Sequence, residues 1–379
     1  MLMAATMQIA FASWSSLMNN FAHDVLSFSG REIGIQQSIR EIPGFLSFAA
    51  VFLLLAMREQ TLAMISLLLL GGGVAATGYF PSALGFYITT FIGSVGFHYY
   101  ETAHQSLCLQ WLPKKTAAAS LGKILRIAAF AQLCAYLMIY VAWRVFELPF
   151  TSVFLLAGGI TVAMVGLMWA MFPTFPEGVP QNKKLVLRKR YWLYYAMTFM
   201  AGARRQIFLV FASFLMVEKF GYPVHDVAIL FFINGAVTMT LAPLIGSWIG
   251  KIGERKALTV EYIGLMGVFT AYAFVESAWI AAGLYIIDHA FFAMAIAMKT
   301  YFQKIADPAD IAPTAGVAFT INHIAAVFIP IVFGLLWLVS PAAVFLSGTA
   351  MAGVSLVLAR LIPHAPEPGQ EVMDFRAAS

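Results

Sequence analysis

The sequence predicts an all-α membrane protein, with about twelve transmembrane helices arranged as two six-helix halves. Of its 379 residues, 61% are hydrophobic and only 11% are charged, whereas soluble domains carry about 25% charged residues. The apolar residues fall into about twelve stretches, and a helix needs about 20 such residues to cross the hydrocarbon of a bilayer. The most polar stretch, residues 173–190, has six of these segments on either side.

Each apolar stretch predicts one helix, and the breaks between stretches fall at polar or Pro- and Gly-containing loops. Residues 2–18 are read as part of the first spanning helix, because no basic flank and only a weak cleavage cue accompany them. The predicted helices cover residues 2–22, 31–57, 60–79, 84–110, 116–143, 150–173, 190–217, 225–250, 257–275, 278–303, 311–338 and 341–362.

The loops are unequally charged, and this predicts the orientation. One side holds three basic residues: Arg31, Arg144 and Lys219. The other side holds fourteen: Arg58, Lys114, Lys115, Lys183, Lys184, Arg188, Lys189, Arg190, Lys251, Arg255, Lys256, Lys304, Arg360 and Arg376. Because Lys and Arg are enriched in cytoplasmic loops, both termini are predicted to be cytoplasmic. The net charge of +5 reflects this bias rather than nucleic-acid binding, because no basic stripe is interleaved with aromatic residues.

The polar stretch divides the chain into predicted domains. We expect an N-terminal six-helix bundle over residues 1–172, a cytoplasmic linker over 173–190, a C-terminal six-helix bundle over 191–363 and a cytoplasmic tail over 364–379. A weak internal similarity, between Leu125–Ala129 and Asn322–Ala326, fits a duplication of the kind common in transporters.

Charged and histidine residues deep within the apolar segments are confined to a subset of the helices. They occur in the second, fourth, fifth, seventh, tenth and eleventh segments. The third, sixth and twelfth carry none at depth, and the ninth carries only Glu261 near one end. A charge facing lipid costs at least about 2.5–3.5 kcal/mol, so such residues face protein or water-filled cavities. This distribution favours a transporter over a membrane anchor.

A loop motif follows the eighth segment, where the chain reads GSWIGKIGERK over residues 246–256. It resembles the short Gly- and basic-rich loop of the major facilitator superfamily, in its second-half copy. The equivalent first-half loop, Met57–Gln60, departs from that pattern. The resemblance implies two pseudo-symmetric bundles around a central cavity, transport by alternating access, and a monomer. It also implies a gating role for the motif residues Gly246, Gly250, Lys251, Glu254, Arg255 and Lys256.

Acidic and histidine residues in the apolar segments are candidates for proton coupling. In the fourth segment, Glu101 lies between His98 and His104 on one helical arc of about 120°. A carboxyl group in an apolar setting holds its proton more firmly, and a nearby Arg reverses this, so its protonation depends on conformation. Glu101 is therefore the leading candidate. The complete set is Glu41, His98, Glu101, His104 and Asp288.

Arginine residues in three of the same segments favour an anionic substrate, because a guanidinium group presents a planar fork that matches carboxylate and phosphate. Of the adjacent pair Arg204 and Arg205, only one can point directly into a cavity. The candidate substrate-binding residues are Arg40, Tyr100, Arg126, Arg204, Arg205, His289, Asn322 and His323. If each deep acid pairs with one Arg, the substrate would instead be neutral, and this alternative stays open.

The same residues also allow other functions. The His, Glu and Asp candidates are suitable ligands for a transition metal, so transport of a metal or metal chelate is the first alternative. A membrane metalloenzyme using the HxxExxH pattern of residues 98–104 is a second alternative, but no zinc motif with a physical rationale has this spacing. No Lys-Ser/Thr follows Gly71–Gly73, so that run predicts a helix-packing surface and not a P-loop. We therefore expect no enzyme activity, cofactor or resident metal. The expected partners are a small-molecule substrate, protons and the lipid bilayer, in a bacterial inner membrane.

Overall fold

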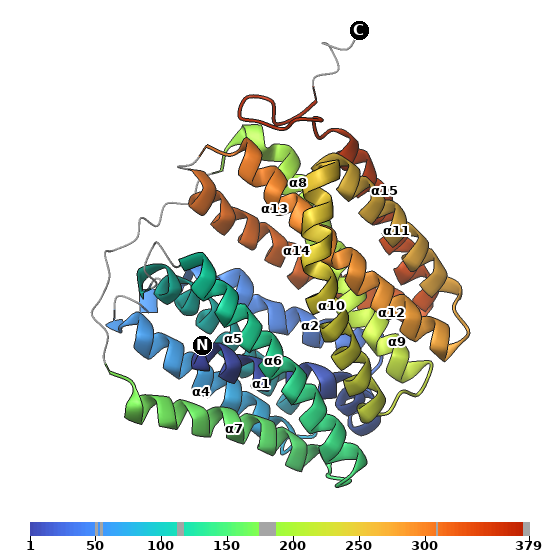
Figure 1. Cartoon of the computed structure of the whole chain (residues 1–379). Helices are drawn as coiled ribbons and strands as arrows, with labels where there is room; N and C mark the ends of the chain where they lie inside the picture. The colour runs from blue at the N-terminus through green and yellow to red at the C-terminus, as the bar shows by residue number, and fades with distance from the viewer. Residues whose placement is uncertain (50–51, 54–55, 112–116, 174–186, 308–309, 374–379) are drawn as a thin grey trace. The chain divides into compact units, whose positions relative to one another are not determined.

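The computed structural model describes residues 1–49, 52–53, 56–111, 117–173, 187–307 and 310–373 (Figure 1). These residues form helices and loops with no β-strand among them, and the helices fall on the predicted segments. Nine of the described helical stretches are long and apolar enough to cross a membrane. The all-α membrane class is thus confirmed, whereas the count of twelve and the cytoplasmic termini stay predictions. Most of the predicted linker and the end of the tail lie outside the described residues.

The chain divides into two compact units. Unit 1 contains Met1–Gln181 and Val217–Gly235, and unit 2 contains Asn182–Met216 and Ala236–Ser379. One helix, α10 (Val224–Ile252), starts in unit 1 and continues into unit 2.

Unit 1 is built on six helices and the first part of α10. Its helix α4 packs against both α5 and α7, α1 packs on α6 and α7, and α2 packs on α5. Phe21 lies at its core, edge-on to Phe154 at 5.4 Å and tilted towards Phe86 at 5.5 Å between ring centroids. The helices are α1 (Leu2–Asn20), α2 (Gly30–Phe45), α4 (Glu59–Thr77), α5 (Ala83–Trp111), α6 (Ala117–Arg144) and α7 (Phe150–Met171).

Unit 2 is organised around two close helix pairs, α11 with α15 and α8 with α14, and α8 also packs on α15. The α8 helix runs into a π-helical turn, Ile207–Ala212, before α9 (Ser213–Glu218). The predicted tenth segment is divided by a short 3-10 turn, Ala293–Ala295. The helices are α8 (Trp192–Gln206), α11 (Glu254–Phe274), α12 (Ala278–Phe292), α13 (Ile296–Ile305), α14 (Ile311–Val339) and α15 (Pro341–Arg360).

Helix ends follow from local sequence. Ser29 and Glu32 form a capping box at the start of α2, in which each side chain bonds to the backbone of the other residue. Pro43 lies inside α2 and removes a backbone donor, and the helix gives way to a 3-10 turn within three residues. Gly253 precedes α11 with φ +82°, a conformation that residues with a side chain rarely adopt.

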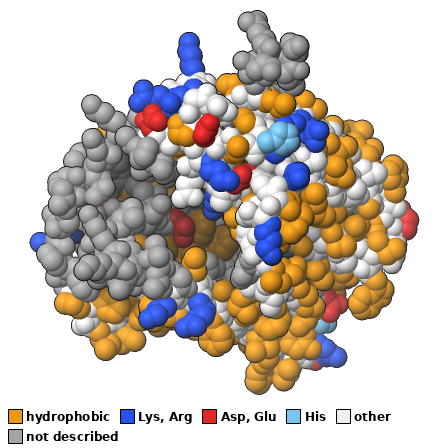
Figure 2. Space-filling model, turned by 45° about the horizontal axis from the view of Figure 1, so that its top comes forward, with side chains coloured by type: hydrophobic (Ala, Val, Ile, Leu, Met, Phe, Trp, Pro, Cys, Tyr) orange, Lys and Arg blue, Asp and Glu red, His pale blue; other side chains and the backbone are white. Residues whose placement is uncertain are grey.

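Hydrophobic side chains cover broad areas of the face drawn in Figure 2. In water, exposing them would cost about 25 cal/mol per Å² of apolar surface. On membrane-spanning helices they face lipid instead, where this cost does not arise. Exposed large apolar residues include Leu84 of α5, Met171 of α7, Trp279 of α12, Phe328 of α14 and Val357 of α15.

The Gly71–Gly73 run is a helix-packing surface, as predicted. A Cβ atom added to Gly158 of α7 would lie 2.3 Å from both the Ala75 nitrogen and the Gly71 oxygen of α4. On the other side of α4, a Cβ at Gly73 would lie 2.8 Å from the nitrogen of Gly93 in α5. These neighbours are backbone atoms, which cannot turn aside as a flexible side chain can.

We therefore expect Gly158→Ala to force α4 and α7 apart and to destabilise unit 1 by about 1–3 kcal/mol, the usual cost of overpacking. The neighbouring Gly159 has open space around its Cβ position, so Gly159→Ala should be neutral or stabilising by up to about 1 kcal/mol. The thermal midpoint of each variant in detergent measures this difference. Equal midpoints for the two variants would show that the close approach is not required.

Candidate functional site

A buried cluster of charged residues lies within unit 2, centred on Arg204 of α8, whose side chain is 6% exposed. One terminal nitrogen of the Arg204 guanidinium lies 3.7 Å from Oε1 of Glu261 on α11, and the other donates to the Ser355 hydroxyl on α15. The guanidinium carbon also lies 4.5 Å from the centroid of the Tyr262 ring. Arg204 thus links three helices of the same unit through its charge.

A second acid belongs to this cluster. Asp288 of α12 is 2% exposed and lies close enough to Arg204 and Glu261 to interact electrostatically with both. The sequence pointed to Arg204 and Asp288 but missed Glu261, which lies near one end of its predicted segment. A single charge in the otherwise uncharged predicted segment 257–275 was the available signal, and the structure shows that residue to be 3% exposed.

The backbone of α8 lies very close to α14 at Gly202, two residues before Arg204. A Cβ atom at Gly202 would lie 2.9 Å from the Asn322 carbonyl oxygen, so only glycine fits here without a shift. Arg205, next to Arg204, points in a different direction and is half-buried. Atoms of the Asn322 backbone and side chain both lie close to Gly202. Asn322, one of the predicted substrate ligands, thus packs against α8.

In unit 1, Arg40 and Glu41 of α2 pair with each other. The Arg40 Nε and a terminal nitrogen donate to Glu41 Oε1 at 3.1 and 2.5 Å, and Gln37 donates to the same oxygen at 3.1 Å. Glu41 is 1% exposed. Its carboxylate and a ring nitrogen of His98 lie within 4.8 Å of each other. The positive charge of Arg40 is therefore largely compensated within its own helix.

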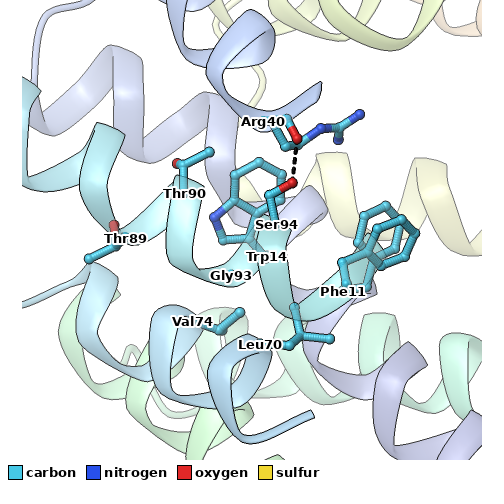
Figure 3. A pocket seen from close by; sticks show the side chains of 10 residues that line it. Phe11, Trp14, Arg40, Leu70, Val74, Thr89, Thr90, Gly93 and Ser94 are labelled. Carbon is cyan, nitrogen blue, oxygen red and sulfur yellow. Dashed lines mark hydrogen bonds between the residues drawn. The ribbon is translucent and has the colours of Figure 1, made fainter. Parts of the chain in front are cut away.

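A small pocket in unit 1 lies between α1, α2, α4 and α5 (Figure 3). Ser94 donates a hydrogen bond to the Arg40 carbonyl oxygen at its edge. The volume open to the centre of a water molecule inside the cavity is about 20 Å³. This is enough for one or two waters and too small for an organic solute. Its walls are formed by Phe11, Trp14, Arg40, Leu70, Val74, Thr89, Thr90, Gly93, Ser94 and Phe97.

The predicted cluster on α5 is only partly brought together. Tyr100 and His104 stack at 5.1 Å, as their four-residue spacing predicts, and Tyr100 is fully buried inside unit 1. His98 is also buried, whereas the Glu101 side chain is exposed. No ion pair involves Glu101 among the described residues. Tyr100 is therefore enclosed by the protein, and Glu101 is accessible.

Arg126 lies on α6, a helix with no acidic residue, and its side chain is exposed. Within unit 1, α6 packs mainly on α1 and α7, and neither of these helices has a charged residue. Lys123, one turn earlier on α6, is exposed as well. In the described part of the chain, no acidic side chain pairs with Arg126. This helix therefore carries uncompensated positive charge.

The two remaining histidines of the prediction are held by their own helices. In each, Nδ1 lies within hydrogen-bond distance of the carbonyl oxygen four residues earlier: His289 to Tyr285 at 3.2 Å and His323 to Phe319 at 2.9 Å. Because a carbonyl only accepts, Nδ1 carries the proton and Nε2 is the acceptor in the neutral ring. The His289 ring also meets the Phe208 ring edge-on at 4.3 Å.

Part of the loop motif is tied to the end of the chain. Lys304 of α13 holds the buried Glu254 at 2.7 Å, and Arg255 lies 3.2 Å from His364 and 3.3 Å from Met373 in the tail. Lys251 and Lys256 are exposed, as is Gly250, while Gly246 is half-buried. Contacts of Glu254 and Arg255 thus fix the start of α11 to the tail and α13.

A second ion-pair network lies at the start of α14. Arg188 donates to both carboxylate oxygens of Asp310, at 3.0 and 3.1 Å, and Tyr191 donates to one of them at 3.2 Å. Arg190 lies 3.5 Å from Asp310 and also pairs with Asp307. The hydrogen bonds and charge of Arg188 hold the pKa of Asp310 below its usual value.

This lowered pKa predicts a pH-dependent stability. A carboxyl group whose pKa is lowered by folding stabilises the folded state fully at pH values above its pKa in the unfolded chain, which is about 3.9 for Asp. This stabilisation is lost as the pH falls through the pKa of the group in the folded state. The thermal midpoint of the wild type should therefore exceed that of Asp310→Asn by a constant amount above that pH, and the gap should close in acid. Asp226→Asn, at an exposed carboxylate, is the control. A gap that does not depend on pH would contradict the charge-based account.

The fold and the buried charges indicate the class of protein. Apolar helices long enough to cross a membrane, with arginine and acid residues paired in their interior, are typical of an integral membrane transporter. The chain belongs to the Major Facilitator Superfamily, whose family model matches residues 1–330. A search of curated proteins gives no significant match.

Solved structures with the same fold include two transporters. A point mutant of the nucleoside transporter NupG aligns with a TM-score of 0.78 and 14% identity over 95% of this chain and 97% of that one. A bacterial homologue of the human lysosomal transporter Spinster, inward-facing and occupied, aligns with a TM-score of 0.76 and 12% identity over 99% of this chain and 97% of its own. At these identities the likeness concerns the fold alone.

Proposed function

We propose that this protein is a proton-coupled secondary transporter that moves a small organic anion across a bacterial inner membrane by alternating access. The positive charge on α6 is the observation that supports an anion most directly. Arg40 pairs with Glu41 and Arg204 with Glu261, so two of the three predicted arginine sites are compensated within their units. Arg126 has no such partner among the described residues, and its fork suits a carboxylate or phosphate.

Glu101 is the proposed coupling residue. It is an accessible acid on α5, which carries no Lys or Arg. Protonation there would change the charge of the transport path by one unit for each cycle. Buried Glu41, which already accepts three hydrogen bonds, is less suited to exchange a proton at each cycle. The cytoplasmic position of both termini and a monomeric state belong to the same proposal.

A transport assay with purified protein in liposomes tests the proposed substrate class. The panel contains small carboxylates and phosphate esters, neutral nucleosides and sugars, and divalent metal ions. We expect an anion to be transported, and Arg126→Gln to weaken its binding about 10–100-fold, because a charge-assisted hydrogen bond contributes about 1.5–3 kcal/mol. Arg126→Lys should retain part of this binding, since it keeps the charge and loses only the planar fork.

Arg144→Gln is the matched control, because this residue is an exposed arginine at the other end of the same helix. It should leave binding unchanged. Transport of a neutral nucleoside that is indifferent to Arg126→Gln would contradict the anionic substrate. Transport of a metal ion alone would replace the proposal with a metal transporter.

A further inference from the structure

The cluster around Arg204 in unit 2 contains more acid than base. Two carboxyl groups, Glu261 and Asp288, face one guanidinium group. With all three groups ionised, the cluster would carry one net negative charge. All three residues are at most 5% exposed, and an uncompensated buried charge costs several kcal/mol even after the protein relaxes.

No second cation compensates this charge among the described residues. Arg204 is the only cation that acts on either carboxyl. Of the nearest lysines, Lys304 pairs with Glu254, and Lys299 is exposed. Arg360 is the last residue of α15. The other titratable residues on the helices that pack here are Tyr194, Tyr195, Arg205, Arg255, Lys256, Tyr262, Tyr272, Tyr285, His289, Tyr301 and His323.

The hydrogen bonds around Glu261 and Asp288 are consistent with one of these two carboxyl groups being protonated. Glu261 Oε2 and Asp288 Oδ2 are both buried and have no hydrogen-bond partner among the described residues. The 3.7 Å separation between Arg204 and Glu261 is an ion-pair distance but exceeds a normal hydrogen bond. An ionised carboxylate would need several donors to offset its lost hydration, whereas a neutral carboxyl needs fewer.

We propose that Glu261 and Asp288 form a proton-binding site inside unit 2, in which one of the two carboxyl groups holds a proton while Arg204 neutralises the other. In this state the cluster is neutral and can remain dry. Loss of the proton to water leaves two carboxylates that share one guanidinium, and this requires water to reach the cluster. The site is separate from Glu101 and goes beyond the proposed function, because it needs no assumption about the substrate.

Infrared spectroscopy of the full-length protein in lipid, without substrate, tests this at neutral pH. A protonated carboxyl gives a carbonyl stretch that is separate from carboxylate bands and shifts in heavy water. We expect the wild type to show it and both Glu261→Gln and Asp288→Asn to lose it, since either variant leaves one acid for one Arg204. Arg204→Gln should roughly double the band, because both acids then bind a proton.

Two controls separate this site from other acids. Glu254→Gln removes a buried acid that pairs with Lys304, and Glu101→Gln removes the proposed coupling residue. Neither should remove the band of the unit 2 cluster. A band that survives in both Glu261→Gln and Asp288→Asn, or its absence in the wild type, would overturn the proposal. If one variant does not fold, the other still decides. Since no substrate is present, failure of the anion proposal leaves this result unaffected.

Discussion

Arg204→Met is expected to destabilise unit 2 by about 3–5 kcal/mol, the usual cost of removing one partner from a buried ion pair. The substitution keeps the apolar length of the side chain but leaves Glu261 without a cation and Ser355 without its donor. The Glu261 carboxyl then has to bind a proton to remain buried, and at neutral pH this protonation costs free energy of folding. Methionine is flexible enough to fill the remaining space, so lost packing should contribute little. The thermal or denaturant midpoint in detergent measures the effect.

A double-mutant cycle isolates the ion pair from other effects. In the Arg204→Met background, Glu261→Gln should restore about 1–3 kcal/mol, because residues in direct contact are usually coupled by such amounts. Arg205→Met is the adjacent control, at a half-buried position, and should cost less. Strict additivity of Arg204→Met and Glu261→Gln would show that the contact carries no stabilising energy.

Glu101→Gln should abolish pH-driven accumulation of the substrate while preserving exchange. A gradient of one pH unit is worth about 1.4 kcal/mol for each proton, which sustains about a tenfold concentration ratio when one proton moves with each substrate. Glutamine has nearly the same shape and cannot release a proton, so this ratio should fall to about one. Uptake into liposomes with and without an imposed pH gradient measures it, and counterflow of labelled substrate measures exchange.

The matched control for this variant is Glu59→Gln, at the first residue of α4. It should leave both accumulation and exchange intact. If Glu101→Gln accumulates substrate as well as the wild type does, then the coupling proton binds elsewhere. The Glu261 and Asp288 pair would then be the first place to examine, through the same liposome assay.

The helices were predictable because a membrane imposes a simple rule. Each span must be long, apolar and internally hydrogen-bonded, so the limits of the apolar runs predict the helices to within a few residues. The exceptions are local. The π-helical turn at Ile207–Ala212 and the 3-10 turn at Ala293–Ala295 interrupt apolar sequence that contains no Pro or Gly. Hydropathy does not record such a local change in the backbone hydrogen-bond pattern.

Partners of individual charges were harder to predict. Spacing along one helix correctly indicated the stack of Tyr100 on His104, because both residues belong to α5. It could not indicate that Arg204 points towards α11 and α15, since this depends on the rotation of α8 about its axis. Glu261 was missed for the same reason. The distance of a residue from the end of a segment says nothing about which neighbouring helix it faces.

Close backbone contacts at glycines restrict the relative motion of some helices of unit 1 more than that of others. Backbone atoms of α4 lie against those of α5 and α7 at Gly73, Gly158 and Gly96, where an added Cβ would lie 2.3–2.8 Å from backbone atoms. Helices in such contact cannot slide or rotate past each other without breaking it, so these three move as one block. Any rearrangement within unit 1 would then involve α1, α2 and α6, and the last two carry Arg40, Glu41 and Arg126. Glu101, in contrast, lies on α5 within the block, so a rearrangement of this kind would move the arginines relative to the proposed coupling residue.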